Sequence, residues 1–194
     1  MSDIELRQAT VGDYDNNVYV LVDRATNESI LIDAPFEPDT IEGLTNGTTV
    51  KYILLTHGDY DHIQALPEME RRLGAPVAIH PADAHNLSKA PNRSIEDGDV
   101  FTFGESSVRA VHTPGHTPGS ISLVAGDILI SGDTLFPGGP GNTKREGGDF
   151  GAVIASVGRL FELPDGTTVH PGHGKSTTIG AEKPHLQEWI DRGW

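Results

Sequence analysis

Thr56-His57-Gly58-Asp59-Tyr60-Asp61-His62 is the stretch that decides the fold, because it places four ionisable side chains directly after an apolar run. That run, residues 50–55 (VKYILL), is typical of a strand that is buried on both faces. Two histidines and two aspartates this close together would repel one another or lose solvation unless a cation lay among them. The stretch therefore predicts a metal site at the end of a buried strand.

Three further polar clusters also follow predicted strands. They contain His116 in HTPGHTPGS (112–120), Asp133 in SGDT (131–134) and His173 in HPGHG (170–174). Any one of these segments alone is typical of an ordinary turn. Strand ends that converge on one rim, however, are where α/β proteins place ligand sites. Imidazole and carboxylate are the main ligands other than sulfur for zinc, iron and manganese, so the set indicates a catalytic metal centre.

The surrounding sequence predicts many short strands interspersed with fewer helices. Strands are expected at residues 17–23, 29–34, 50–55, 76–80, 100–103, 108–112, 120–124, 128–131 and 168–170. Helices are expected at 38–44, 61–73, 82–87, 150–163 and 182–191. Hairpin-like pairs interrupt the alternation of strands and helices, which favours a mixed-sheet α/β sandwich over a parallel doubly wound sheet. No repeat or linker divides the chain, so a single domain over 1–194 is expected.

Composition excludes several classes of function. The formal net charge of −14, with no run of Lys or Arg, argues against nucleic-acid binding and against docking on an anionic membrane. The absence of cysteine excludes disulfides, thiolate metal sites and cysteine nucleophiles. The first residues lack the features of a secretion signal, and no apolar stretch approaches a membrane span, so a cytoplasmic location is expected.

The order of the polar clusters resembles that of the metallo-β-lactamase fold superfamily, over nearly the whole chain from about Asn17 to Gly174. That family has a first motif HxHxDH, then a histidine, a bridging aspartate and a final histidine. Here the corresponding positions are His57–His62, His116, Asp133 and His173. The phrases HTPGHTPGS, GDTLFPGG (132–139) and HPGHG look most like the glyoxalase II-like branch. The resemblance implies a four-layer αββα sandwich with the metals at one edge of its two sheets.

The resemblance also implies roles for individual residues. It assigns two divalent metal ions, usually zinc in this family, to His57 and His116 for the first ion, to Asp61, His62 and His173 for the second, and to Asp133 for both. Asp61 is in addition the candidate catalytic carboxylate. A hydroxide bridging the ions would attack an electrophilic carbonyl, and the ions would stabilise the oxyanion that forms.

One position departs from the family pattern, because Asp59 stands where HxHxDH has its second histidine. Flavodiiron proteins of the same superfamily carry a carboxylate here. We predict that Asp59 is a ligand, and its added negative charge favours iron or manganese over zinc. Aspartate is also shorter than histidine. If Asp59 fell short of the first ion, only one ion would be held tightly.

The remaining predictions concern the substrate and the oligomeric state. Hydrolysis of a small-molecule thioester or related ester is expected, by a monomer or homodimer. About twenty residues follow His173, fewer than the helical extension that binds glutathione in typical glyoxalase II enzymes. Tyr60 is predicted to line the pocket mouth, and Lys144 and Arg145 are candidates to grip an anionic group, although an ordinary solvated loop fits them as well.

Other functions remain open from the sequence. A lactonase or phosphoesterase would use the same mechanism. An oxygen-dependent iron enzyme acting on persulfides, a redox diiron protein, or a non-catalytic binding protein with this fold are the alternatives from other classes. Among the other histidines, His112 and His170 are expected to support the site, and His80, His85 and His185 to be solvated. Ser120 is expected to cap the turn after His116.

Overall fold

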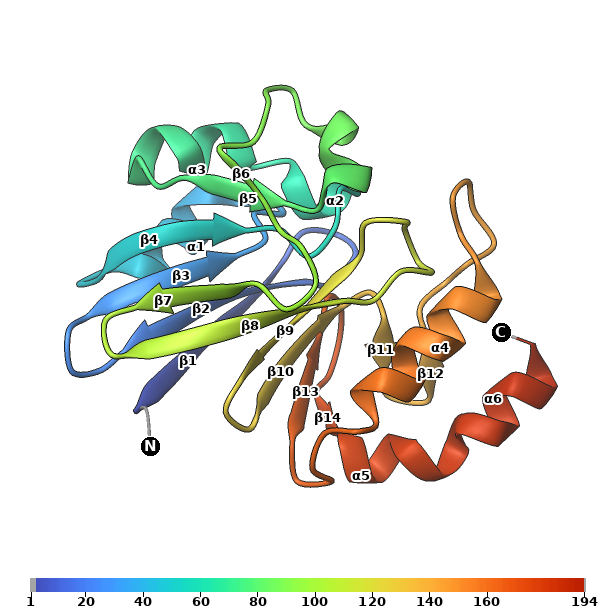
Figure 1. Ribbon diagram of the computed structural model, residues 1–194. Helices are drawn as coiled ribbons and strands as arrows, with labels where there is room; N and C mark the ends of the chain where they lie inside the picture. Colours follow the sequence, from blue (N-terminus) through green and yellow to red (C-terminus); the bar gives the residue numbers. More distant parts are fainter. Residues whose placement is uncertain (1–2, 194) are drawn as a thin grey trace.

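Two six-stranded mixed sheets lie face to face and carry helices on both outer faces (Figure 1). The computed structural model describes residues 3–193. The four-layer αββα sandwich expected from the sequence is confirmed. Within the described residues, no helix is both long and apolar enough to cross a membrane.

The first sheet has the strand order β1-β2-β3-β4-β5-β6. Its strands are β1 (Ile4–Val11), β2 (Asn16–Asp23), β3 (Glu28–Ile32), β4 (Thr49–Leu54), β5 (Val77–Ile79) and β6 (Arg93–Ser94). The first three strands are antiparallel, and β3 to β6 are parallel. The parallel strands end at one edge, and the first polar cluster follows β4 there.

The second sheet has the order β14-β13-β10-β9-β8-β7. Its strands are β7 (Val100–Phe103), β8 (Ser106–His112), β9 (Ile121–Ala125), β10 (Ile128–Gly132), β13 (Thr168–Pro171) and β14 (Thr177–Thr178). A small hairpin of β11 (Leu135–Phe136) and β12 (Gly139–Pro140) follows β10. Only β10 and β13 pair in parallel, so the polar clusters that follow these two strands meet at the same edge.

The helices divide between the two outer faces (Figure 1). Beside the first sheet lie α1 (Pro38–Thr45), α2 (Tyr60–Ile63) and α3 (Leu66–Leu73), and beside the second lie α4 (Phe150–Leu160), α5 (Ile179–Glu182) and α6 (Leu186–Arg192). Short 3₁₀ turns occupy Pro81–Asn86 and Lys183–His185. The expectations of regular helices at 82–87 and 182–191 are therefore only partly correct.

The single helix expected at 61–73 is wrong, because the chain breaks there into α2 and α3. The Ala65 amide donates to the carbonyl of Ala34, 2.9 Å away, outside any helix. Pro67 then lacks an amide hydrogen and stands in the first turn of α3, where that loss costs least. The break lets α2 present its side chains to the sheet edge while α3 packs on the sheet face.

Three apolar cores separate the four layers. One lies between the first sheet and α1 and α3, with Ile41 and Met69 among its buried residues. The second lies between the sheets, where Tyr19 and Ile32 meet Phe101 and Phe103. The third lies under α4 and α6 and includes Trp189. Both sheets are thus buried on both faces, which leaves their edge as the place for a polar site.

Candidate metal centre

All seven side chains predicted as metal ligands meet at the shared edge of the two sheets. Three groups have ligand atoms within 4.8 Å of one another: His57, Asp59 and His116; Asp61, His62 and His173; and His57, His62 and Asp133. We call the first group the first half of the centre and the second group the second half. Asp133 lies between them, with its Oδ2 3.5 Å from His116 Nε2 and 3.4 Å from His173 Nε2.

Different elements deliver these side chains. His57 follows β4, and Asp61 and His62 lie on α2. His116 lies in the turn between β8 and β9, and Asp133 and His173 follow β10 and β13. Because successive parallel strands end at one edge, residues more than a hundred positions apart are brought into contact.

The separations between the ligand atoms fit a shared cation. In the first half, Asp59 Oδ2 lies 3.5 Å from His57 Nε2 and 3.0 Å from His116 Nε2. In the second half, His173 Nε2 lies 3.4 Å from Asp61 Oδ2 and 3.1 Å from His62 Nε2. Ligand atoms around a tetrahedral zinc stand about 3.3–3.6 Å apart, given bonds of about 2.0–2.2 Å. The spacing therefore fits divalent ions.

Two buried atoms support the same interpretation. His57 Nε2 and Asp133 Oδ1 lack a hydrogen-bond partner within residues 3–193. A buried polar atom without a partner costs free energy, and both of these atoms point into the cluster. The donor set of four imidazoles and three carboxylates therefore fits divalent metal ions.

Each imidazole is held through its other ring nitrogen, so that Nε2 faces the centre. The Nδ1 partners are Thr56 Oγ1 for His57 at 2.9 Å, Asp33 Oδ2 for His62 at 3.0 Å, the Asn142 carbonyl for His116 at 2.8 Å and the Tyr14 carbonyl for His173 at 2.7 Å. A carbonyl or carboxylate oxygen can only accept. The rings of His62, His116 and His173 therefore carry a proton on Nδ1 and, when neutral, direct a lone pair to the centre from Nε2.

Asp33 is a supporting residue that sequence reasoning missed. It is buried and accepts hydrogen bonds from the Thr56 amide and hydroxyl, both at 2.8 Å, as well as contacting His62. Its φ of 60° lies in the left-handed region, which aspartate tolerates better than most residues. The strand predicted at 29–34 includes Asp33, whereas β3 ends at Ile32, so an ionisable residue near the end of an apolar strand was the one available signal.

Asp83 is the second supporting residue that was missed. Its carboxylate accepts from the Gly58 amide at 3.0 Å, the Thr117 hydroxyl at 2.7 Å and the Gly119 amide at 2.8 Å. It thereby joins the segments that carry His57 and His116. A Cβ at Gly119 would lie 2.5 Å from this carboxylate, so only glycine allows the approach.

The second half has its own supports. Asn16 Nδ2 donates to Asp61 Oδ2 at 3.0 Å and to the Asp61 carbonyl at 3.1 Å. Gly172, in the segment HPGHG, leaves room for the centre, because a Cβ there would lie 2.1 Å from Asp133 Oδ1. This glycine is thus required by close packing against the shared aspartate.

The charges of the centre perturb its pKa values in the metal-free protein. Burial raises the pKa of Asp59, but hydrogen bonds with His116, His57 and Arg145 outweigh it and hold the pKa far below its usual range. Burial lowers the pKa of His62, but the charges of Asp133, Asp33 and Asp61 outweigh it and raise the pKa to about 9. Protons therefore compensate part of the carboxylate charge when metal is absent.

The three predicted substrate-binding residues lie in different surroundings. Tyr60 is 69% exposed and lines a cavity of about 310 Å³ together with Asp59, Asn86 and Arg145. Arg145 donates through both terminal nitrogens to the two oxygens of Asp59. Lys144 lines a separate cavity. Arg145 therefore lies against Asp59 and Lys144 beside another cavity, and their role in gripping an anionic substrate group stays a prediction.

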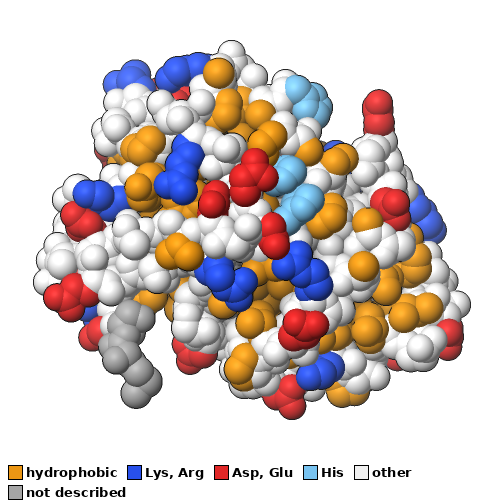
Figure 2. Space-filling view, viewed as in Figure 1, with side chains coloured by type: hydrophobic (Ala, Val, Ile, Leu, Met, Phe, Trp, Pro, Cys, Tyr) orange, Lys and Arg blue, Asp and Glu red, His pale blue; other side chains and the backbone are white. Residues whose placement is uncertain are grey.

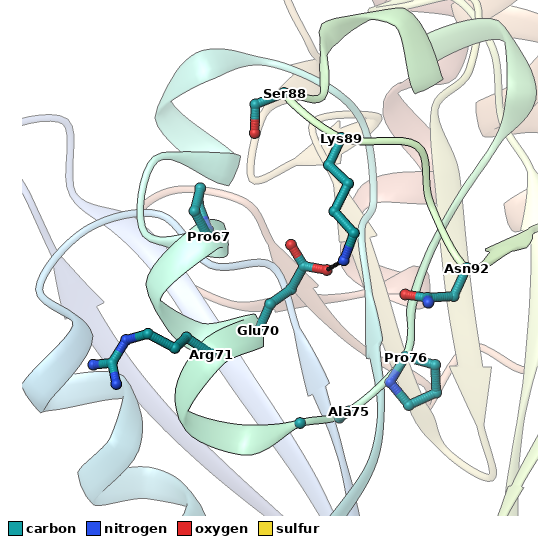
Figure 3. A pocket seen from close by; sticks show the side chains of 9 residues that line it. Pro67, Glu70, Arg71, Ala75, Pro76, Ser88, Lys89 and Asn92 are labelled. Atoms are coloured by element: carbon teal, nitrogen blue, oxygen red, sulfur yellow. Dashed lines mark hydrogen bonds and ion pairs between the residues drawn. The ribbon is translucent and has the colours of Figure 1, made fainter.

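A larger cavity, about 560 Å³, lies away from this edge, between α3 and the loop after the Pro81–Asn86 turn (Figure 3). The ion pair of Glu70 and Lys89, 3.2 Å apart, spans it. None of the seven candidate ligands lines it. On the face drawn in Figure 2, basic side chains are scattered among acidic ones rather than gathered in one patch.

The remaining histidines behave mostly as expected. His112 Nε2 lies 2.9 Å from the Pro118 carbonyl, near the turn of His116, and Ser120 Oγ accepts from the Thr117 amide in that turn. The expectation that His80 is simply solvated is wrong. Its ring stacks on that of His112, with centroids 4.1 Å apart, because the 3₁₀ turn that follows it packs beside the end of β8.

Two curated relatives are similar in sequence to most of this chain. One relative is the hydroxyacylglutathione hydrolase of Anaeromyxobacter dehalogenans, 37% identical over 162 residues, covering 82% of this chain and 61% of the relative. Another is the probable metallo-hydrolase YqgX of Bacillus subtilis, 33% identical over 199 residues, covering 91% and 93%.

Three solved structures share the fold. The BLEG-1 B3 metallo-β-lactamase has a TM-score of 0.88 at 30% identity, covering 94% of this chain and 98% of the other. ETHE1 from Myxococcus xanthus has 0.86 at 30%, covering 97% and 89%. TTHA1623 in a di-iron-bound form has 0.79 at 34%, covering 91% and 96%.

The family profile of the metallo-beta-lactamase superfamily matches residues 11–173, which include every candidate ligand. The match covers most of the chain and runs from β1 to the final histidine of the second half. Together with the αββα fold and the converging histidines and aspartates, it shows that the chain belongs to the metallo-beta-lactamase superfamily.

Proposed function

We propose that this protein is a metal-dependent hydrolase that cleaves a small-molecule thioester or related ester. The observation that carries the proposal is the convergence of four imidazoles and three carboxylates at tetrahedral spacing around a buried, unpartnered His57 Nε2. Membership of a superfamily that includes a probable metallo-hydrolase and a hydroxyacylglutathione hydrolase supports it.

The ligand assignment follows the two halves. His57, Asp59 and His116 would hold the first ion; Asp61, His62 and His173 would hold the second; Asp133 Oδ2, which faces His116 and His173, would serve both. When bound, such ions lower the pKa of a coordinated water and polarise a carbonyl oxygen.

Neighbouring residues orient the candidate ligands and fix the tautomers of the imidazoles. Asp33 and the Tyr14 carbonyl hold the proton on Nδ1 of His62 and His173, which keeps Nε2 free to bind. Asn16 fixes Asp61, whose side chain is 27% exposed and which is the candidate catalytic carboxylate that would orient a reacting water. Tyr60 and Asn86 border the adjoining cavity, where the acyl portion of a substrate would lie.

The metal proposed is iron or manganese rather than zinc. A third carboxylate, Asp59, adds negative charge and a hard oxygen donor to the centre, which favours these ions. The structural likeness to TTHA1623 in a di-iron-bound form, at 34% identity, supports this choice.

A second candidate follows from the same observation. If the ions are iron, the centre could support an oxygen-dependent reaction, such as the oxidation of a persulfide. Asp59 and the di-iron relative favour it over a non-catalytic role. Oxygen consumption separates this reaction from hydrolysis, because hydrolysis consumes only water.

The test is a substrate screen on matched protein samples. Metal-stripped protein and protein reloaded with Fe²⁺, Mn²⁺ or Zn²⁺ would be assayed with hydroxyacyl-glutathione thioesters, lactones, phosphodiesters and a β-lactam, with an oxygen electrode on a persulfide. We expect thioester hydrolysis only in reloaded protein, lost in His173→Ala and retained in His185→Ala, which changes a histidine on the far 3₁₀ turn. Turnover of a persulfide with oxygen uptake and no thioester cleavage would favour the second candidate.

A further inference from the structure

The strongest unexplained feature is Arg145, a cation placed inside a site built for cations. Its two terminal nitrogens donate to the two oxygens of Asp59. One of them also lies 3.2 Å from His116 Nε2, the atom that faces the centre. Arg145 therefore contacts two of the three side chains of the first half.

The segment that carries Arg145 is itself part of the centre. It runs between β12 and α4, and its Asn142 carbonyl accepts the Nδ1 proton of His116. The Gly148 amide donates to the Arg145 carbonyl at 3.1 Å, and the Asp149 amide donates to the Gly115 carbonyl at 2.8 Å. The guanidinium is thus delivered by a segment that is anchored on both sides of it.

The charges of the two halves differ as a result. With neutral imidazoles, Asp59 gives the first half one negative charge, and the guanidinium cancels it. In the second half the acidic groups instead face histidines, with Asp61 3.4 Å and Asp133 3.4 Å from His173 Nε2. An incoming divalent ion therefore meets a guanidinium paired with Asp59 in the first half, whereas Asp61 and Asp133 in the second half are paired with His173.

Competition between the guanidinium and an ion follows from this geometry. An ion bound by Asp59 and His116 would stand beside the guanidinium nitrogen that contacts both of them. Like charges at such a distance repel strongly in a partly buried site. Asp59 is well suited to either partner, because a planar carboxylate matches the fork of an arginine as readily as it binds a metal.

We propose that Arg145 is an internal cation that competes for Asp59 with the metal ion of the first half, so that the chain binds an ion tightly in the second half and binds an ion in the first half only when Arg145 leaves. The proposal rests on the metal-binding part of the function proposed above. It gives Arg145 a task different from gripping substrate, since its nitrogens are engaged by Asp59.

The test is a metal titration that does not depend on activity. Stripped wild-type protein, Arg145→Ala and Lys144→Ala would be titrated with Mn²⁺ and Zn²⁺ against a chelating dye, and bound metal counted by mass spectrometry after gel filtration. Lys144→Ala is the matched control, because it removes the neighbouring charge on the same segment. Thermal unfolding would establish that each variant is folded. If Arg145→Ala does not fold, Arg145→Gln replaces it, because glutamine keeps most of the side-chain length without the charge.

We expect the wild-type protein to bind the ion of the first half at least about tenfold more weakly than the ion of the second half. Arg145→Ala should tighten binding in the first half by about 10- to 100-fold and leave binding in the second half nearly unchanged, and Lys144→Ala should change neither. Two ions bound equally well in wild-type protein, or a weaker-bound ion whose affinity Arg145→Ala leaves unchanged or lowers, would overturn the proposal. If no ion bound to any variant, the metal-dependent function itself would fail instead.

Discussion

The two halves of the candidate metal centre are built from similar groups but are balanced differently. Each has two imidazoles and one carboxylate, and both share Asp133. The second half is held by the buried carboxylate of Asp33, the side chain of Asn16 and the Tyr14 carbonyl. The first half is held by Thr56 and Asn142, and a guanidinium already occupies its carboxylate.

The comparison shows that ligand type alone does not define a metal site. The groups around the ligands decide which charge is still uncompensated, and therefore which half receives an ion first. In the second half, Asp61 and the shared Asp133 face two histidines. We therefore expect activity to depend on the ion in this half.

The largest effect is expected from removing a ligand of the second half. His62→Ala deletes a fully buried imidazole that lies within 3.1 Å of His173 Nε2. We expect hydrolysis to fall by about 1000-fold or more, because several kcal/mol of transition-state stabilisation depend on the ion. Bound metal, counted by mass spectrometry, should fall with it. Full activity and unchanged metal content would show that the second half is not the working half.

A smaller effect is expected from Asp33→Asn, which tests the second half while leaving every candidate ligand in place. Asparagine tolerates the left-handed backbone at this position, so the change removes mainly the charge that holds His62. We expect metal affinity of the second half to weaken by about 10- to 100-fold. Chelator competition measures it, and the weaker-binding ion should be less affected. An equal loss for both ions would contradict the separation into halves.

Asp83→Ala tests the first half in the same way. The variant would leave the Gly58 and Gly119 amides and the Thr117 hydroxyl without their partner. We expect the free energy of unfolding to fall by about 2–4 kcal/mol, measured by urea denaturation of metal-free protein. The affinity of the first half for its ion should weaken more than the affinity of the second half for its ion. A stable variant with unchanged affinities would remove Asp83 from the account.

The charge balance of the second half also predicts a dependence on pH in metal-free protein. The pKa of His62 is raised from 6.5 to about 9, so its protonated form stabilises the fold fully below about pH 6.5 and this contribution is lost as pH rises through 9. The loss should be about 3 kcal/mol in unfolding free energy. Urea denaturation at pH 6 and pH 9.5 measures it.

The matched control for the pH effect is His62→Asn, which should show a clearly smaller loss over the same interval because asparagine at this position does not titrate. Metal-loaded protein should also lack most of this slope, since a ligand imidazole is neutral throughout. An identical slope in wild-type protein and in the variant would mean that His62 does not carry the effect.

The smallest effect is expected at the rim. Tyr60→Ala removes an exposed ring from the edge of the cavity beside Asp59. We expect KM for a thioester to rise by about two- to fivefold with kcat nearly unchanged, as for an interaction made equally in the ground and transition states. Steady-state kinetics measure both. A fall in kcat with constant KM would place Tyr60 in the chemistry rather than in binding.

Much of the fold followed from local pattern. The apolar run before His57 and the clusters after later strands predicted a mixed-sheet α/β sandwich with a metal site at its strand ends, whereas the four-layer αββα arrangement and the full set of seven ligands followed from the resemblance to the metallo-β-lactamase superfamily. The strand β1 was not predicted, although Ile4 and Leu6 alternate with polar residues, since it pairs only at the edge of the sheet. Pro67 indicates the break between α2 and α3, but the helical spacing of the apolar residues predicts one continuous helix.

The supporting residues could not be predicted, because their meaning lies in distant contacts. Asp83 is 25 residues from Gly58 and 34 from Thr117, and the Arg145–Asp59 pair spans 86. Nothing in the local sequence of PADAH or TKREG distinguishes these residues from an ordinary turn or a solvated loop. Only the fold brings them to the centre.

The most direct measurement is the anomalous scattering of crystals of metal-reloaded protein, recorded at the absorption edge of the added metal. It locates each ion independently of activity. The account predicts a strong peak within bonding distance of Asp61, His62, His173 and Asp133, and a weaker one beside His57 and His116. A metal found elsewhere, or no peak among these side chains, would contradict it.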